Sequence, residues 1–228
     1  MAYLLIPGAG GSAWYWHRVV ELLEAAGVEA IAVDLPADDV DADLLTYADV
    51  ASVAAMETAG PLTVVGQSMG AMTAPIVAER LPTESLVLVN PMVPKPGESG
   101  GQWWENTGQK PAQIEYFREI GLDRTEFDFV EDFFHDVPAE VRAEALRRPE
   151  PDQSDTPFLE PWPLPDWPEV ATRVLVGEQD RLFPLDFQRR VVRERLGLEV
   201  QVVPGGHLVA LSHPAELVTA LLDSAQRP

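Results

Sequence analysis

Leu62-Thr63-Val64-Val65-Gly66-Gln67-Ser68-Met69-Gly70-Ala71-Met72 is the part of the chain from which its architecture can be predicted. Branched apolar residues precede Gly66 in a run dense enough for a strand buried on both faces. Residues 69–80 have the composition of a helix, so Gly-x-Ser-x-Gly lies at a strand-to-helix turn. We therefore expect Ser68 on a strained turn, with its hydroxyl exposed at the carboxyl edge of a parallel sheet.

The residues around Ser68 fit this interpretation. Gly66 and Gly70 carry no Cβ, so the strand and the helix can approach closely. The helix would also present N–H groups and the positive end of its dipole to an anion forming at Ser68. A motif of three common residues also occurs by chance, in glycine-rich turns without a catalytic role. The strand before it and the helix after it favour Ser68 as a nucleophile.

Composition limits the possible partners. The chain has 228 residues, 46% of them hydrophobic, which is enough for one domain with an inserted subdomain. Its formal net charge of −21 argues against nucleic acid or an anionic membrane as a partner. The absence of cysteine excludes disulfides, thiolate nucleophiles and cysteine-ligated metals. The first residues have no basic segment and only a short apolar run, so we expect a cytoplasmic protein without a signal peptide.

Strands and helices alternate along most of the chain, which predicts parallel βαβ units. The expected strands are residues 3–6, 28–35, 62–65, 85–90, 172–177 and 199–203. The expected helices of this part are residues 14–26, 44–59, 69–80, 185–196 and 214–225. The first strand leads into Pro7-Gly8-Ala9-Gly10-Gly11, whose N–H groups could approach an oxyanion or a phosphate. The loop lacks the lysine and spacing of a P-loop, which favours the oxyanion.

Residues 92–165 interrupt the alternation. They contain paired aromatic residues and helical stretches near 112–120, 126–134 and 139–147, but no convincing strand. We expect a helical cap over the carboxyl edge of the sheet, where open α/β sheets bind ligands, and a core formed by residues 1–91 and 166–228. The proline-rich residues 149–168 should run extended back to the sheet. Aromatic residues of the cap could form its own small core or line a pocket, and the pocket candidates are Trp103, Trp104, Phe117 and Phe133.

A serine nucleophile needs a base within hydrogen-bond reach, and the base needs a group that orients it. In this architecture both follow later strands, in the order serine, acid, histidine. Asp180 and His207 lie just after the last two expected strands. We assign His207 as the base and Asp180 as its orienting acid, with Glu178 and Asp186 as rival acids. The remaining histidines are interpreted as structural: His17, His135 and His213.

The oxyanion formed at an attacked carbonyl needs two preorganised donors. We expect one to be the backbone N–H of Met69, directly after the nucleophile. The other should come from the glycine-rich loop, most simply from Ala9. No metal site is assigned.

These motifs resemble those of the α/β-hydrolase superfamily over nearly the whole chain. Gly-Gln-Ser-Met-Gly, the acid and histidine in that order, and the glycine-rich first loop carry the resemblance. Pro7-Gly-Ala-Gly-Gly-Ser-Ala-Trp-Tyr-Trp16, followed by the helix end Glu-Leu-Leu-Glu-Ala-Ala-Gly27, is similar to the branch with plant methylesterases, hydroxynitrile lyases and their bacterial relatives. This resemblance implies a helical cap, no cofactor and a small ester or related substrate.

Three positions depart from that branch. Pro7 stands where the branch usually has histidine, so the oxyanion loop must be anchored differently. Gln67 replaces a frequent histidine. Leu208 stands where the lyases carry lysine, which weakens a lyase interpretation. The first strand of the chain resembles the third strand of the family, so we expect an α/β-hydrolase fold with six mainly parallel strands flanked by helices.

The leading hypothesis is a cofactor-independent serine hydrolase that cleaves a small, partly apolar carboxylic ester through an acyl-enzyme on Ser68. One alternative is a thioesterase, or a lyase or cyclase that uses the same triad, because one site can support several chemistries. Another is a ligand-binding protein that keeps the triad without turnover. The expected partner is a small molecule, and oligomeric state cannot be read from the sequence.

Overall fold

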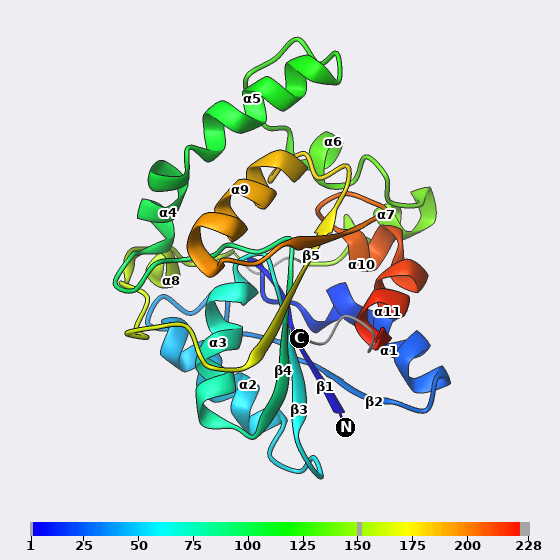
Figure 1. Ribbon diagram of the computed structural model, residues 1–228. Helices are drawn as coiled ribbons and strands as arrows, with labels where there is room; N and C mark the ends of the chain where they lie inside the picture. The colour runs from blue at the N-terminus through cyan, green and yellow to red at the C-terminus, as the bar shows by residue number, and fades with distance from the viewer. Residues whose placement is uncertain (1, 150–151, 224–228) are drawn as a thin grey trace.

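A computed structural model describes residues 2–149 and 152–223, and its centre is one parallel β-sheet (Figure 1). The six strands follow the order β2-β1-β3-β4-β5-β6, and every neighbouring pair is parallel. This confirms the predicted sheet. The strands are β1 (Ala2–Ile6), β2 (Glu29–Ala32), β3 (Leu62–Gln67), β4 (Thr83–Val89), β5 (Ala171–Gly177) and β6 (Val200–Val203).

Side chains of the strands alternate between two hydrophobic cores, one on each face of the sheet. In β1, Leu4 and Ile6 join one core while Tyr3 and Leu5 join the other. The first core is covered by α2 (Leu44–Ala54), α3 (Gly70–Arg80) and α9 (Leu185–Leu196). The second is covered by α1 (His17–Ala25), α10 (Val209–Ser212) and α11 (Pro214–Leu222), which Figure 1 shows on the opposite side of the strands.

Several predicted boundaries differ from the structure. The helix expected at 14–26 begins as a 3-10 turn, η1 (Ala13–Trp16), and α2 ends before the predicted residue 59. The last helix was expected to reach residue 225, but residues 224 and 225 lie outside the described part, as do residues 150 and 151 of the proline-rich stretch. None of the helices in the described ranges has the length and hydropathy needed to cross a membrane.

Between β4 and β5 the chain runs through a helical segment, residues 92–165, that lies beyond the carboxyl end of the sheet (Figure 1). The first helix of this segment was not predicted; it starts with a capping box between Ser99 and Gln102. The proline-rich stretch is also not wholly extended, because Pro157 occupies the first turn of a short helix, where proline is tolerated. The helices are α4 (Gly100–Thr107), α5 (Gln109–Glu119), α6 (Phe129–Phe133), α7 (Ala139–Ala145) and α8 (Thr156–Leu159).

A buried ion pair joins the start of the helical segment to the core. The side chains of Glu98 and of Arg195, from α9, are 5% and 4% exposed, and the guanidinium contacts both carboxylate oxygens. The carboxylate also accepts hydrogen bonds from Asn106 Nδ2 at 2.8 Å and the Lys95 N–H at 3.0 Å. Burial by itself would raise the pKa of Glu98, but these donors outweigh it and hold the pKa below its ordinary value.

Glu98→Gln is expected to lower the free energy of unfolding at pH 7 by about 3 kcal/mol, because it leaves the buried Arg195 without a counter-charge. Since the pKa of Glu98 is lowered by folding, its contribution is complete above the unfolded pKa and is lost as pH falls through the folded pKa. The free energies of unfolding of the wild type and of Glu98→Gln, measured with urea, should therefore converge in acid. Glu199→Gln, which removes the exposed partner of Arg193, is the control and should change stability by less than about 1 kcal/mol.

Candidate active site

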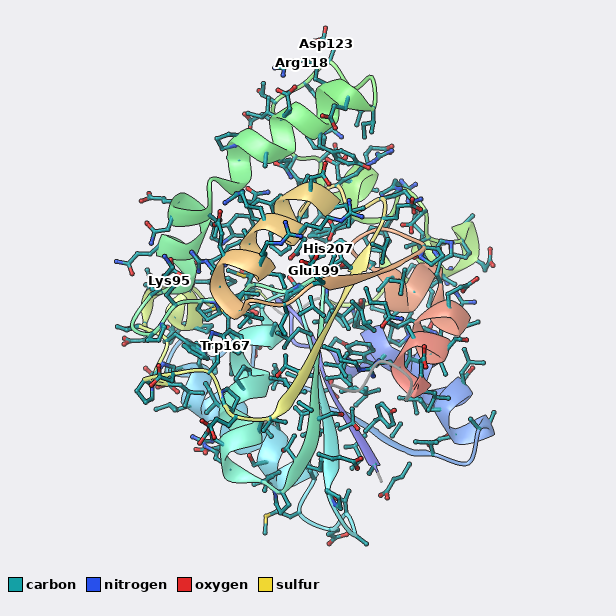
Figure 2. The ribbon with its side chains drawn as sticks, in the orientation of Figure 1. Lys95, Arg118, Asp123, Trp167, Glu199 and His207 are labelled. Carbon is teal, nitrogen blue, oxygen red and sulfur yellow. The ribbon has the colours of Figure 1, made fainter. Side chains whose placement is uncertain are left out.

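Ser68, His207 and Asp180 form a continuous chain of hydrogen-bonding groups at the carboxyl edge of the sheet. His207 Nε2 lies 3.0 Å from Ser68 Oγ, and His207 Nδ1 lies 2.7 Å from Asp180 Oδ2. Asp180 is fully buried, and His207 and Ser68 are 3% and 8% exposed. Figure 2 shows His207 beneath the helical segment, while Arg118 and Asp123 lie at the far tip of that segment. The structure thus brings the three predicted residues together.

Ser68 occupies the turn between β3 and α3 with a φ of 52°, in the left-handed region that non-glycine residues seldom adopt. Its N–H donates to Val89 O at 3.0 Å, and its carbonyl accepts from the Met92 N–H at 3.0 Å and from the Ala71 N–H at 3.1 Å. These bonds hold the strained residue from both sides. A Cβ on Gly70 would lie 2.8 Å from Ile6 O and closer still to Pro7 O, so only glycine permits this approach of α3 to β1.

Backbone N–H groups hold the carboxylate of Asp180 in its orientation toward His207. Its Oδ1 accepts hydrogen bonds from the N–H groups of Leu182 at 2.8 Å and Phe183 at 2.9 Å. Only Oδ2 then faces His207, so Nδ1 of the ring carries the proton and Nε2 is left to accept from the Ser68 hydroxyl. In this tautomer the imidazole can act as a base toward Ser68.

The rival acids lie elsewhere. Glu178 is exposed, and the Asp186 side chain is 93% exposed beside Arg189. His17 stacks on Trp14, and His135 and His213 both lie near Asp136. Burial lowers the pKa of His135 despite the opposing charge of Asp136.

The glycine-rich loop after β1 crosses directly over the nucleophile. A Cβ built on Gly8 would lie 3.0 Å from Ser68 Cβ and 2.5 Å from Gln67 Oε1, so the backbone passes as closely as sterics allow. Ala9, the predicted oxyanion donor, follows in the exposed wall of the cavity beside Ser68. Met69, the other predicted donor, directly precedes α3, where helix N–H groups are free of intrahelical partners.

A cavity of about 380 Å³ opens beside Ser68 and His207. Its walls are mainly apolar and aromatic, and the helical segment adds the polar side chains of Arg148, Asp152 and Gln153. Tyr15 belongs to this wall; burial raises the pKa of its phenol, whose oxygen accepts from the Ala210 N–H at 3.5 Å. The other apolar residues of the wall include Trp14, Phe129, Phe134, Leu208 and Leu211.

Of the four aromatic residues predicted to line a pocket, Phe133 does line this cavity, with its ring centroid 5.2 Å from that of His207. Trp103 and Phe117 do not, because both are fully buried. The Trp103 indole donates to Val93 O at 3.0 Å, and Phe117 packs under the Arg124 guanidinium. Trp104 lies instead at a separate surface groove formed with Pro111 and Phe127.

The His207 loop is held by two residues that were not predicted, Asn90 and Asp136. The fully buried Asn90 follows β4, and its Nδ2 donates to the carbonyls of Gly206 and His207, both at 3.1 Å. Its Oδ1 accepts from the Gly177 N–H at 2.7 Å. From the helical segment, Asp136 Oδ2 accepts the Gly206 N–H at 2.7 Å. A polar residue at the end of a buried strand was the available signal for Asn90, whereas nothing in the sequence indicated Asp136.

Comparison with known proteins agrees with this architecture. A model of the alpha/beta hydrolase family matches residues 3–220. A probable esterase, PIR7A, from Oryza sativa subsp. indica is 27% identical, covering 99% of this chain and 97% of its own length. Methylesterase 3 of Arabidopsis thaliana is 24% identical, covering 98% and 95%. Among solved structures, a pyrethroid hydrolase from Sphingobium faniae superposes with a TM-score of 0.73 at 20% identity, covering 100% of this chain and 98% of that one.

Proposed function

The chain belongs to the alpha/beta hydrolase family, and we propose that it is a cofactor-independent serine hydrolase that cleaves a small carboxylic ester through an acyl-enzyme on Ser68. The observation that supports this most is the buried hydrogen-bonded series from Asp180 through His207 to Ser68, which ends at a cavity. We also propose that residues 92–165 act as a cap over a core formed by residues 1–91 and 166–228.

In the proposed mechanism, Ser68 Oγ attacks the ester carbonyl while His207 Nε2 takes its proton. The N–H groups of Ala9 and Met69 receive the negative charge that develops on the carbonyl oxygen. His207 then returns the proton to the departing alkoxide, and the acyl group stays on Ser68. A water molecule, deprotonated by His207, releases the acid and restores Ser68.

The cavity favours a small substrate with an apolar or aromatic part. A volume of about 380 Å³ is at the low end for pockets that enclose small molecules, and its walls are mainly apolar. The esterase and methylesterase relatives support an ester as the reacting group. Leu208 directly follows His207, so the chain offers no lysine there for a lyase reaction.

Exposure to a fluorophosphonate should add the mass of one phosphonyl group to the wild-type protein and none to Ser68→Ala. The reason is that the probe reacts only with a serine activated by a neighbouring base. Intact-mass spectrometry measures the adduct. Labelling of Ser68→Ala, or no labelling of the wild type, would contradict an activated Ser68 and favour a binding protein.

A series of p-nitrophenyl esters should then be hydrolysed with kcat/KM falling steeply as the acyl chain outgrows the cavity. Release of p-nitrophenolate is followed by absorbance. Labelling without turnover of any of these esters would favour a different leaving group or a non-hydrolytic reaction.

A further inference from the structure

We propose that Gln153 is a positioning residue that anchors the oxyanion loop. Its side-chain Oε1 accepts a hydrogen bond from the Gly10 N–H at 2.9 Å. Gly10 directly follows Ala9, whose N–H is one of the proposed oxyanion donors. The inference rests on the proposed function and concerns how the reacting site is held.

The loop needs an anchor at this point. Pro7 has neither a backbone N–H nor a polar side chain. Among the hydrogen bonds of residues 2–149 and 152–223, two join residues 7–11 to other parts of the chain. One runs from the Leu35 N–H to Gly11 O at 2.7 Å, at the end of the loop. The other is the bond to Gln153, next to Ala9. Ala9 itself is exposed, so packing does little to fix its peptide plane.

The Gln153 side chain is itself held in a single orientation. Its Nε2 donates to Ser154 O at 2.9 Å and contacts the Tyr47 hydroxyl at 3.1 Å, with Ala37 O at 3.5 Å. Carbonyl oxygens can only accept, and the Gly10 N–H can only donate, so the amide oxygen must face Gly10. The backbone beside Gln153 is fixed as well, because the Ser154 N–H donates to Ala37 O at 2.7 Å.

The anchor therefore comes from the return of the helical segment, more than 140 residues from the loop in sequence. It restrains the peptide that carries a proposed donor without touching the reacting atoms. Loss of this restraint should weaken stabilisation of the transition state more than binding of the substrate. The reason is that the Ala9 N–H stabilises the carbonyl oxygen of the ester mainly after negative charge has developed on that oxygen.

Gln153→Met, which keeps the length but removes the acceptor, should lower kcat for a small p-nitrophenyl ester by about 10- to 100-fold and leave KM nearly unchanged. Gln153→Asn, whose amide is one methylene too short to reach Gly10, should show the same loss. Tyr47→Phe is the matched control, because it removes the hydroxyl at Nε2 and keeps the bond to Gly10. It should stay within about threefold of the wild type.

A trifluoromethyl ketone provides the second measurement. Ser68 Oγ adds to its carbonyl carbon, the hydroxyl proton moves to His207, and the former carbonyl oxygen becomes an alkoxide at the oxyanion donors. Its inhibition constant should rise in Gln153→Met and Gln153→Asn by the same factor as kcat/KM falls.

The proposal is overturned if both Gln153 variants, folded by circular dichroism, keep kcat within about threefold of Tyr47→Phe. It is also overturned if the loss falls on KM alone and ketone inhibition is unchanged. Either result would leave wild-type turnover and Ser68 labelling intact. A wild-type protein that neither turns over esters nor labels at Ser68 would instead refute the proposed function, and with it this role of Gln153.

Discussion

Ser68→Ala is expected to lower kcat for ester hydrolysis by about 10⁶-fold, because the acyl-enzyme can no longer form. The change removes only the hydroxyl that lies 3.0 Å from His207 Nε2. The backbone bonds that hold residue 68 do not involve its side chain, so the variant should fold. The residual rate is that of attack by water, aided by the oxyanion donors and by binding alone. Steady-state hydrolysis of the best p-nitrophenyl ester measures the ratio.

Ser12→Ala is the matched control for this experiment. Ser12 also lines the cavity, but its hydroxyl accepts from the Trp14 N–H and does not contact His207. Its kcat should stay within about tenfold of the wild type. Turnover by folded Ser68→Ala within a hundredfold of the wild type would refute a covalent mechanism and point to direct attack by water.

Asp180→Asn is expected to lower kcat by about 10⁴-fold without unfolding the protein. The N–H groups of Leu182 and Phe183 would retain the amide oxygen at the position of Oδ1. The amide NH₂ must then point at His207 Nδ1, which can only accept from it. The ring proton is forced onto Nε2, and the histidine can no longer take the Ser68 proton.

The comparison with Asp186→Asn and Glu178→Gln makes this result specific. Both acids lie near Asp180 in sequence but are exposed. Each should keep kcat within about threefold of the wild type. If Asp180→Asn folds and loses less than tenfold, another group orients His207 and the assignment of the acid is wrong. The pH dependence of kcat/KM in the two exposed controls should match the wild-type profile.

The sheet and the proposed reacting residues could be predicted for the same reason. Runs of branched residues mark strands that are buried on both faces, and parallel strands end at one edge of the sheet. Polar residues that directly follow such strands must therefore meet there, as Ser68, Asp180 and His207 do. The order of Ser68, Asp180 and His207 along the chain was predicted from the architecture, without knowing the distances between these residues.

The walls of the cavity could not be predicted in the same way. The orientation of a helix around its axis depends on what it packs against, and a single sequence does not give the packing partner of a helix within residues 92–165. Trp103 therefore looked like Phe133 in the sequence, although it belongs to the core. The helix that contains it was missed because glycine is common in residues 97–101, although Ser99 and Gln102 have the spacing of a capping box.

Supporting contacts were the least predictable part. Gln153 and Asp136 each accept a hydrogen bond from the N–H of a glycine that is far away in sequence. Such bonds leave no periodicity or motif, because any acceptor of suitable length in a suitable loop could form them. Asn90 is the exception, since a buried strand ended by an amide side chain is itself unusual.

Asp136 and Gln153 both belong to residues 92–165; Asp136 accepts a hydrogen bond from the N–H of Gly206, next to His207, and Gln153 accepts one from the N–H of Gly10, in the loop beside Ser68. The helical segment is therefore not an interchangeable module. A chimera that received this segment from a relative would inherit a new cavity wall but lose two acceptors on which the geometry of its own core depends. A chimera designed to transfer substrate preference between relatives should therefore keep Asp136 and Gln153 of the recipient. Without them, we expect the chimera to have a lower kcat.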